Sequence, residues 1–132
     1  MNVHIEEAIR KVLERHSYIR LAILFGSFAT GHISSDSDLD VAVDAGRPIT
    51  VDEKMKLIED LAIEIGRPVD LIDLHTVGEP LLGRIVTRGR RLMGDDTRYA
   101  NWIRKHLFEQ ADFMPYRSRI LAERRQRWIG KL

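Results

Sequence analysis

The chain has 132 residues, a net charge of +1 and no cysteine, and 44% of its residues are hydrophobic. This length fits one compact domain with a real core, and the lack of cysteine excludes disulfides, thiolate metal sites and cysteine nucleophiles. No apolar run approaches the roughly 20 residues of a membrane helix, and the N-terminus lacks the pattern of a signal peptide. We therefore expect a cytoplasmic protein that makes no use of a membrane.

The first half of the chain predicts a helix and two strands. Apolar residues recur at helical spacing over residues 5–13, with charged residues between them, which predicts an amphipathic helix. The apolar run over residues 21–25, stopped by Gly26, is typical of a buried strand. After a polar, turn-rich segment over residues 31–37, apolar and acidic or small residues alternate over residues 38–44, which predicts a second strand with one apolar face.

The second half predicts helices and strands in alternation. Thr50 can cap a helix over residues 51–65, with Glu53 as the partner in a capping box, and the sequence Val69–Leu74 predicts a third strand. Further along we expect, in order, a helix over residues 79–87, a short edge strand over residues 90–93, and a helical tail after Gly94 that is interrupted near Pro115. The order predicts an α/β fold, with a small mixed β-sheet flanked by helices and a helical C-terminal tail.

The tail differs from the body in charge. From Arg98 to Leu132 there are nine lysines and arginines against three carboxylates, which indicates an anionic partner, a charged protein interface or a solvated helical surface. Aromatic residues lie among these arginines, as they do in many protein interfaces, although they could also pack on the domain. We divide the chain into a domain over residues 1–97 and a tail over residues 98–132 that contacts a protein partner, and we do not expect direct nucleic-acid binding.

A compact motif joins the ends of the first two strands. Gly26-Ser27 ends the first strand, and Asp38-Leu39-Asp40 opens the second after a spacer of about ten residues. Asp38 and Asp40 are two apart on a strand, so both carboxylates should project from one face. Two such neighbours repel one another, and Mg²⁺ resolves the conflict because it takes oxygen ligands and shares its shell with substrate phosphates. Gly26 allows close approach of the backbone, and Ser27 offers a hydroxyl and an N–H to a phosphate.

The third strand supplies further carboxylates, Asp70 and Asp73. Because they are an odd number of residues apart, they should face opposite sides of the sheet, and either one could join Asp38 and Asp40. Three carboxylates around two ions would form the two-metal arrangement for displacement at phosphorus. The five histidines show no metal-ligand spacing, and the candidates for additional phosphate contacts are Arg67, Arg84 and Arg88.

These residues resemble the nucleotidyltransferase superfamily, in which Gly-Ser, a spacer and Asp-x-Asp mark the active site. The segments that carry the match are Leu24-Phe25-Gly26-Ser27-Phe28-Ala29-Thr30-Gly31, Ser35-Asp36-Ser37-Asp38-Leu39-Asp40-Val41-Ala42-Val43 and Pro68-Val69-Asp70-Leu71-Ile72-Asp73-Leu74. Size and detail are most similar to the minimal nucleotidyltransferase (MNT) family, especially the MntA antitoxins of HepT/MntA toxin–antitoxin pairs. The resemblance covers residues 5–95.

The resemblance implies a function and assigns roles. Asp38 and Asp40 would bind two Mg²⁺ ions, Asp70 would bind one of them and activate the acceptor hydroxyl, and Gly26 and Ser27 would hold the phosphates of ATP. We prefer Asp70 to Asp73 because its apolar neighbours fit the family position best.

The implied reaction is transfer of AMP from ATP to a tyrosine of a HepT-type toxin, with which the chain could form a hetero-oligomer. Two alternatives remain open. One is nucleotide transfer to a small molecule such as an aminoglycoside, and the other is an antitoxin that acts by binding alone.

Overall fold

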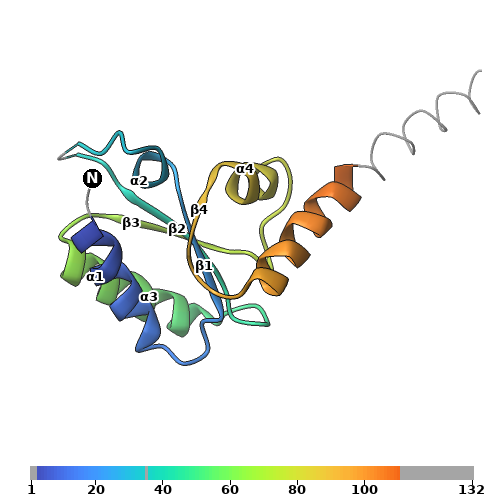
Figure 1. Ribbon diagram of the computed structural model, residues 1–132. Coiled ribbons are helices and arrows are strands. Elements are labelled where there is room, and N and C mark those ends of the chain that lie inside the picture. The colour runs from blue at the N-terminus through green and yellow to red at the C-terminus, as the bar shows by residue number, and fades with distance from the viewer. Residues whose placement is uncertain (1–2, 35, 111–132) are drawn as a thin grey trace, which may run out of the picture.

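Figure 1 shows the computed structural model of the chain, which describes residues 3–34 and 36–110. The named elements are α1 (Val3–Glu14), β1 (Leu21–Phe25), α2 (Ser27–Thr30), β2 (Leu39–Asp44), α3 (Val51–Ile65), β3 (Val69–Asp73), α4 (Leu81–Arg88) and β4 (Arg90–Met93). A further helix covers residues 96–110. No helix in these ranges is long and apolar enough to cross a membrane.

The four strands form one mixed sheet in the order β3-β2-β1-β4. The buried strand β1 is central and pairs antiparallel with both β2 and β4. Strand β3 pairs parallel with β2, and α3 makes the crossover connection that a parallel pair requires. This topology sets the ends of β1, β2 and β3 side by side.

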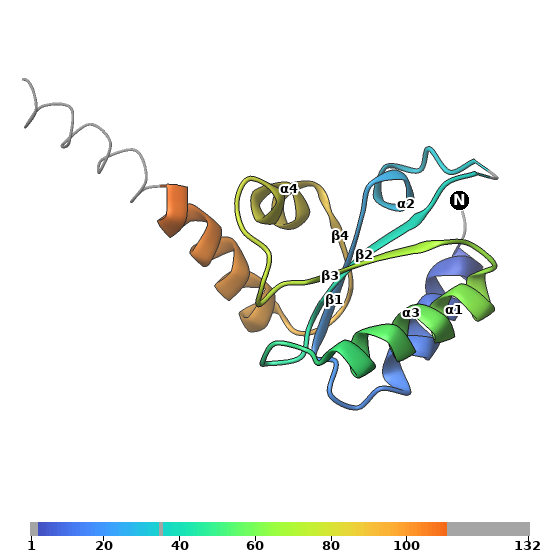
Figure 2. The same ribbon diagram turned by 180° about the vertical axis from the view of Figure 1, so that it is seen from behind.

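Helices cover both faces of the sheet. In Figures 1 and 2, α1 and α3 lie together on one face, whereas α4 lies on the other. The core is correspondingly divided: Leu24, Val41 and Leu71 belong to the cluster that packs with α1 and α3. Ile23 and Ala42 belong to the cluster that packs with α4 and the helix over residues 96–110.

The predicted fold class, an α/β domain with a small mixed sheet flanked by helices, is confirmed. The bounds of β1, α3 and β4 agree with the prediction, and α3 begins at a complete capping box between Thr50 and Glu53. It ends at Gly66, whose φ of 71° is the left-handed conformation typical of a helix C-cap. Strong local signals, a buried apolar run and two caps, explain this agreement.

Other boundaries differ from the prediction. The strand β2 begins at Leu39, because the Leu39 N–H donates the first bond of the ladder, to the Pro68 carbonyl (2.9 Å), and Asp38 lies just outside. The turn after Gly26 is a helix of its own, α2. The predicted tail is helical over residues 96–110, while Pro115 and the rest of the tail lie outside the described residues. The division into residues 1–97 and 98–132 stays a prediction.

Candidate active site

Gly26 brings the backbone against a carboxylate. It caps α2 with φ 66° and ψ −144°, a conformation that is essentially restricted to glycine. An ideal Cβ built on Gly26 would lie 2.3 Å from Oδ2 of Asp40. The turn therefore requires glycine twice, once for its backbone conformation and once for the space that the Asp40 carboxylate fills.

Asp40 and Asp70 are cross-strand neighbours. They are directly opposed in the parallel register of β2 and β3, so their side chains project from the same face. Burial, the negative charges of Asp70 and Asp38, and a hydrogen bond between the Asp40 and Asp70 carboxyl groups raise the pKa of Asp40 above its ordinary value. The fold thus holds two acidic groups in contact, and the charge of Asp70 opposes ionisation of Asp40.

Asp38 completes this acidic set only in part. Its side chain is exposed in the segment before β2, near enough for its charge to act on Asp40. Within residues 3–34 and 36–110, however, no group of three histidine, aspartate or glutamate side chains is arranged to hold a metal ion. The structure brings Asp40 and Asp70 together and leaves Asp38 at the edge of the pair.

Asp73 lies apart from the acidic pair and bonds backbone groups of the neighbouring segments. It is 6% exposed, and its carboxylate accepts hydrogen bonds from the Ile49 N–H and the His75 N–H, both at 2.9 Å. As the odd spacing predicts, it points to the α3 side of the sheet, away from Asp70. The carboxylate of Asp73 therefore stabilises the segments that precede α3 and follow β3. Of the two candidates on β3, only Asp70 lies beside Asp40.

A cleft opens beside the acidic pair. It has a volume of about 320 Å³ and is lined by Phe25, Gly26, Thr30, Asp40, Leu81, Arg84 and Arg88. One wall is thus the β1–α2 turn with Asp40, and the other is α4. This cleft offers a carboxylate, a glycine backbone and two guanidinium groups to a single ligand.

Arg67, a candidate for phosphate contact in the sequence, has a different position. Its guanidinium donates hydrogen bonds to the carbonyls of Ser34 and Ser37, the latter at 3.2 Å. It also lies over the ring of Phe28 in α2, 5.4 Å from the centroid. Arg67 therefore fastens the loop that leads into Asp38 to the helix that begins with Ser27, a role that no local sequence pattern predicts.

The helix over residues 96–110 is anchored at the far end of β2. The Asp44 carboxylate, 1% exposed, accepts hydrogen bonds from Trp102 Nε1 (2.9 Å) and Arg98 (3.0 Å), and lies 2.7 Å from His75 Nε2. Burial raises the pKa of Asp44, but bonds from Trp102, the Gly46 N–H, Arg98 and His75 outweigh it and lower the pKa to about 2. Of the tail aromatics, Trp102 is thus part of the core, whereas Phe108 is 60% exposed.

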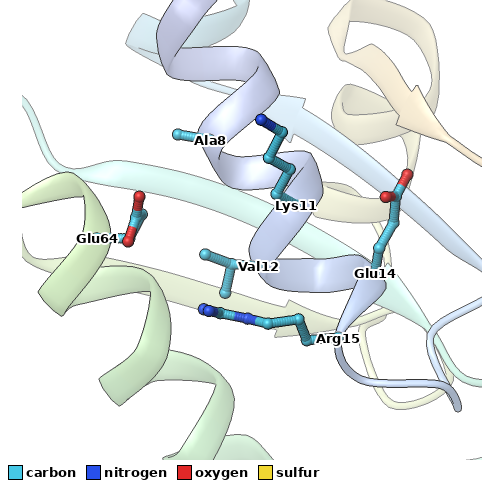
Figure 3. Close-up of a pocket in the computed structure, with 6 residues that line it drawn as sticks. All are labelled: Ala8, Lys11, Val12, Glu14, Arg15 and Glu64. Carbon is cyan, nitrogen blue, oxygen red and sulfur yellow. The ribbon is translucent and has the colours of Figure 1, made fainter.

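A second hollow, of about 460 Å³, lies between α1 and α3 (Figure 3). Its lining residues are Ala8, Lys11, Val12, Glu14, Arg15 and Glu64. None of these belongs to the strand ends that carry the acidic pair, and the two signs of charge alternate around the opening. The hollow therefore has no part in the candidate active site.

Comparison with known proteins identifies the fold. The model of the polymerase beta nucleotidyltransferase family matches residues 7–98. The protein adenylyltransferase MntA of Shewanella oneidensis is 34% identical over 85 residues, which are 62% of this chain and 61% of that relative. The match thus spans less than two thirds of the relative's length. A candidate protein adenylyltransferase of Methanocaldococcus jannaschii is 31% identical over 79 residues, 58% of this chain and 79% of the relative.

Solved structures of toxin–antitoxin complexes match the fold over most of the chain. A chain of a toxin–antitoxin complex with AMP-PNP matches with a TM-score of 0.78 at 27% identity, covering 93% of this chain and 98% of that one. A chain from the complex of a tri-AMPylated Shewanella oneidensis HEPN toxin with an MNT antitoxin has a TM-score of 0.74 at 26% identity, with the same coverage.

Proposed function

This chain belongs to the polymerase beta nucleotidyltransferase family, and from that premise we propose that it is an antitoxin that transfers AMP from ATP to a tyrosine hydroxyl of a HepT-type toxin. The activity and the partner class are those of its MntA relative and of the toxin–antitoxin complexes that it resembles. The added phosphate would place negative charge on the toxin.

One observation carries the proposal. Asp40 and Asp70 are held side by side in the strand register, and Gly26 closes the cleft against the Asp40 carboxylate. The charge of Asp70 contributes to the raised pKa of Asp40, and no cation within the described residues neutralises the pair. A carboxylate whose pKa is raised by burial and a neighbouring negative charge, beside a cleft, is characteristic of a site that acts on a ligand.

The residues fit a divalent cation. Mg²⁺ in nucleotide sites is usually held by one or two carboxylates, with substrate phosphates and water in the remaining positions. Asp40 and Asp70 meet this requirement, and Asp38 is the proposed third ligand once a nucleotide is present. When bound, the metal would neutralise the negative charge that develops on the transferring phosphoryl group.

The side chains have distinct tasks in this proposal. Gly26 and Ser27 bind the phosphates, because the missing Cβ lets them approach the backbone and the serine offers a hydroxyl and an N–H. Asp70 accepts the proton of the acceptor hydroxyl. The acceptor oxygen then forms a bond to the α-phosphorus of ATP, while the bond to the β-phosphate oxygen breaks and pyrophosphate leaves with the electron pair.

A labelling experiment tests the function. The chain is incubated with Mg²⁺, α-labelled ATP and a HepT-type toxin, and labelled peptides are identified by mass spectrometry. We expect AMP on a tyrosine of the toxin, none with Asp40→Asn or Asp70→Asn, and full labelling with Asp52→Asn, an exposed carboxylate on α3. If toxin is neutralised without any label, the chain acts by binding alone. Label found only on an added aminoglycoside would make it a small-molecule enzyme.

A further inference from the structure

Two arginines of α4 face the candidate active site. Arg84 and Arg88 are four residues apart, so they lie on the same side of α4, one turn from each other. Both are exposed, and both line the cleft that Gly26 and Asp40 line from the opposite wall. Within residues 3–34 and 36–110, neither guanidinium forms an ion pair or a side-chain hydrogen bond.

Arg84 and Arg88 are thus available to a ligand that enters the cleft. The salt bridges of the chain engage other arginines, such as Arg47, Arg90, Arg91 and Arg98. A guanidinium presents a planar fork of donors that matches the oxygens of phosphate, and two forks one turn apart suit two neighbouring phosphate groups. The pair is therefore suited to an anionic ligand within the cleft.

The order of the strands indicates which part of a bound nucleotide would lie beside these arginines. At the register of Asp40, the neighbour on one side is Asp70 of β3, and the neighbour on the other side is Phe25 of β1. Helix α4 packs over β1, since Ile23 of β1 belongs to the same core cluster as Leu82 and Ile85 of α4. The sequence across the site is thus Asp70, then Asp40, then the β1–α2 turn with the arginines of α4.

In-line transfer at phosphorus places the attacking and leaving oxygens on opposite sides of the reacting atom. Asp70 lies on the β3 side of Asp40. An acceptor that approaches beside Asp70 therefore displaces the leaving group toward β1 and α4, where Arg84 and Arg88 line the cleft.

From this arrangement we propose that Arg84 and Arg88 form the subsite for the β- and γ-phosphates of ATP, and hence for the departing pyrophosphate. The proposal rests on the proposed nucleotidyl transfer. In the reaction, the electron pair of the broken bond between the α-phosphorus and the bridging oxygen stays on pyrophosphate, and the two guanidinium groups stabilise that charge. The proton from the acceptor remains with Asp70 and takes no part at this subsite.

The subsite is tested by comparing nucleotides that differ only in their phosphates. Calorimetry with Mg²⁺ measures the affinity for ATP and for AMP, and pyrophosphate is tested as an inhibitor of ATP binding. For Arg84→Gln and Arg88→Gln we expect ATP affinity to fall about tenfold each and pyrophosphate inhibition to weaken in parallel, because each change removes a charge-assisted contact. AMP affinity should stay within about twofold of the wild type.

Arg15→Gln is the matched control, since it removes another exposed arginine, from the remote hollow of Figure 3. Thermal unfolding of each variant verifies that it is folded. Unchanged ATP affinity in both α4 variants, or an equal loss of AMP and ATP affinity, would overturn the subsite. So would loss of toxin binding with ATP affinity intact, which would make the arginines a partner surface. If wild-type protein binds no ATP, the proposed function fails together with the subsite, whereas normal transfer by the α4 variants refutes the subsite alone.

Discussion

An alanine at position 26 tests how closely the backbone must approach the acidic pair. The new methyl group would lie 2.3 Å from Oδ2 of Asp40, whereas ordinary contacts between non-bonded heavy atoms are roughly 3.5 Å. The Asp40 carboxylate would therefore have to retreat by about 1 Å, and a displacement of that size in a catalytic group can reduce the rate by about 100-fold. We expect Gly26→Ala to transfer AMP about 100-fold more slowly than the wild type.

The same substitution also strains the backbone. Gly26 has φ 66° and ψ −144°, and a side chain in this region costs on the order of 1–3 kcal/mol. A loss of activity could thus arise from a smaller folded fraction alone. Gly31→Ala separates the two effects, because Gly31 ends the same helix at φ 81° but has no atom within 4 Å of its added Cβ. Gly31→Ala thus also places a side chain at positive φ, but its methyl group does not collide with Asp40.

The assay is the initial rate of AMP transfer at saturating ATP, divided by the folded fraction from urea unfolding of each variant. Gly31→Ala should retain a rate per folded molecule within a few-fold of the wild type, and Gly26→Ala should not. If both variants lose the same factor, the contact between Gly26 and Asp40 is irrelevant to the reaction, and the argument from the missing Cβ is wrong.

Three further predictions concern residues around the site. Because the pKa of Asp44 is lowered to about 2 in the folded chain, its contribution to stability is complete above its ordinary pKa and disappears as the pH falls from about 5 to 2. Acid titration of urea unfolding should show a loss of roughly 2 kcal/mol that Asp44→Asn lacks. Asp73→Asn should lower the free energy of unfolding by about 1–3 kcal/mol, because it disturbs a buried acceptor of two N–H groups. Its rate of AMP transfer per folded molecule should stay near the wild-type value. A loss of rate without a loss of stability would show that Asp73 acts in the active site. Arg67→Ala should increase proteolysis within residues 31–37 and lower kcat. Arg67→Lys should not restore kcat, because an ammonium group cannot both bond the Ser34 and Ser37 carbonyls and lie flat on the Phe28 ring.

Much of the fold could be predicted from the sequence because its signals are local. The run Leu21–Phe25 is apolar throughout since β1 is the central strand, and Thr50 with Glu53 marks the first turn of α3 by side-chain chemistry alone. The odd spacing of Asp70 and Asp73 likewise predicts that they face opposite sides of the sheet. Each of these inferences depends on contacts within a few residues, or on a period that the backbone imposes.

The parts that could not be predicted depend on contacts between distant segments. Arg67 supports a loop 30 residues earlier in the chain, and Trp102 bonds a carboxylate 58 residues away. Neither residue lies in a pattern that distinguishes it from a surface arginine or an interface aromatic. Arg84 lies in the helix predicted over residues 79–87, and Arg88 follows it directly, so their spacing could indicate that they act together. Only the packing of α4 on β1 shows that they face the cleft.

Asp40 and Asp44 show why spacing alone cannot assign a role to a carboxylate. Both lie on β2, and their spacing of four residues places them on the same face of the sheet. Asp44 meets four donors and its pKa falls to about 2, whereas Asp40 meets another aspartate across the register and its pKa rises. One end of the strand thus has its charge satisfied by the protein, which fixes the C-terminal helix. At the other end, no cation of residues 3–34 and 36–110 pairs with Asp40 or Asp70. This unbalanced charge, rather than the presence of an aspartate, distinguishes the candidate active site.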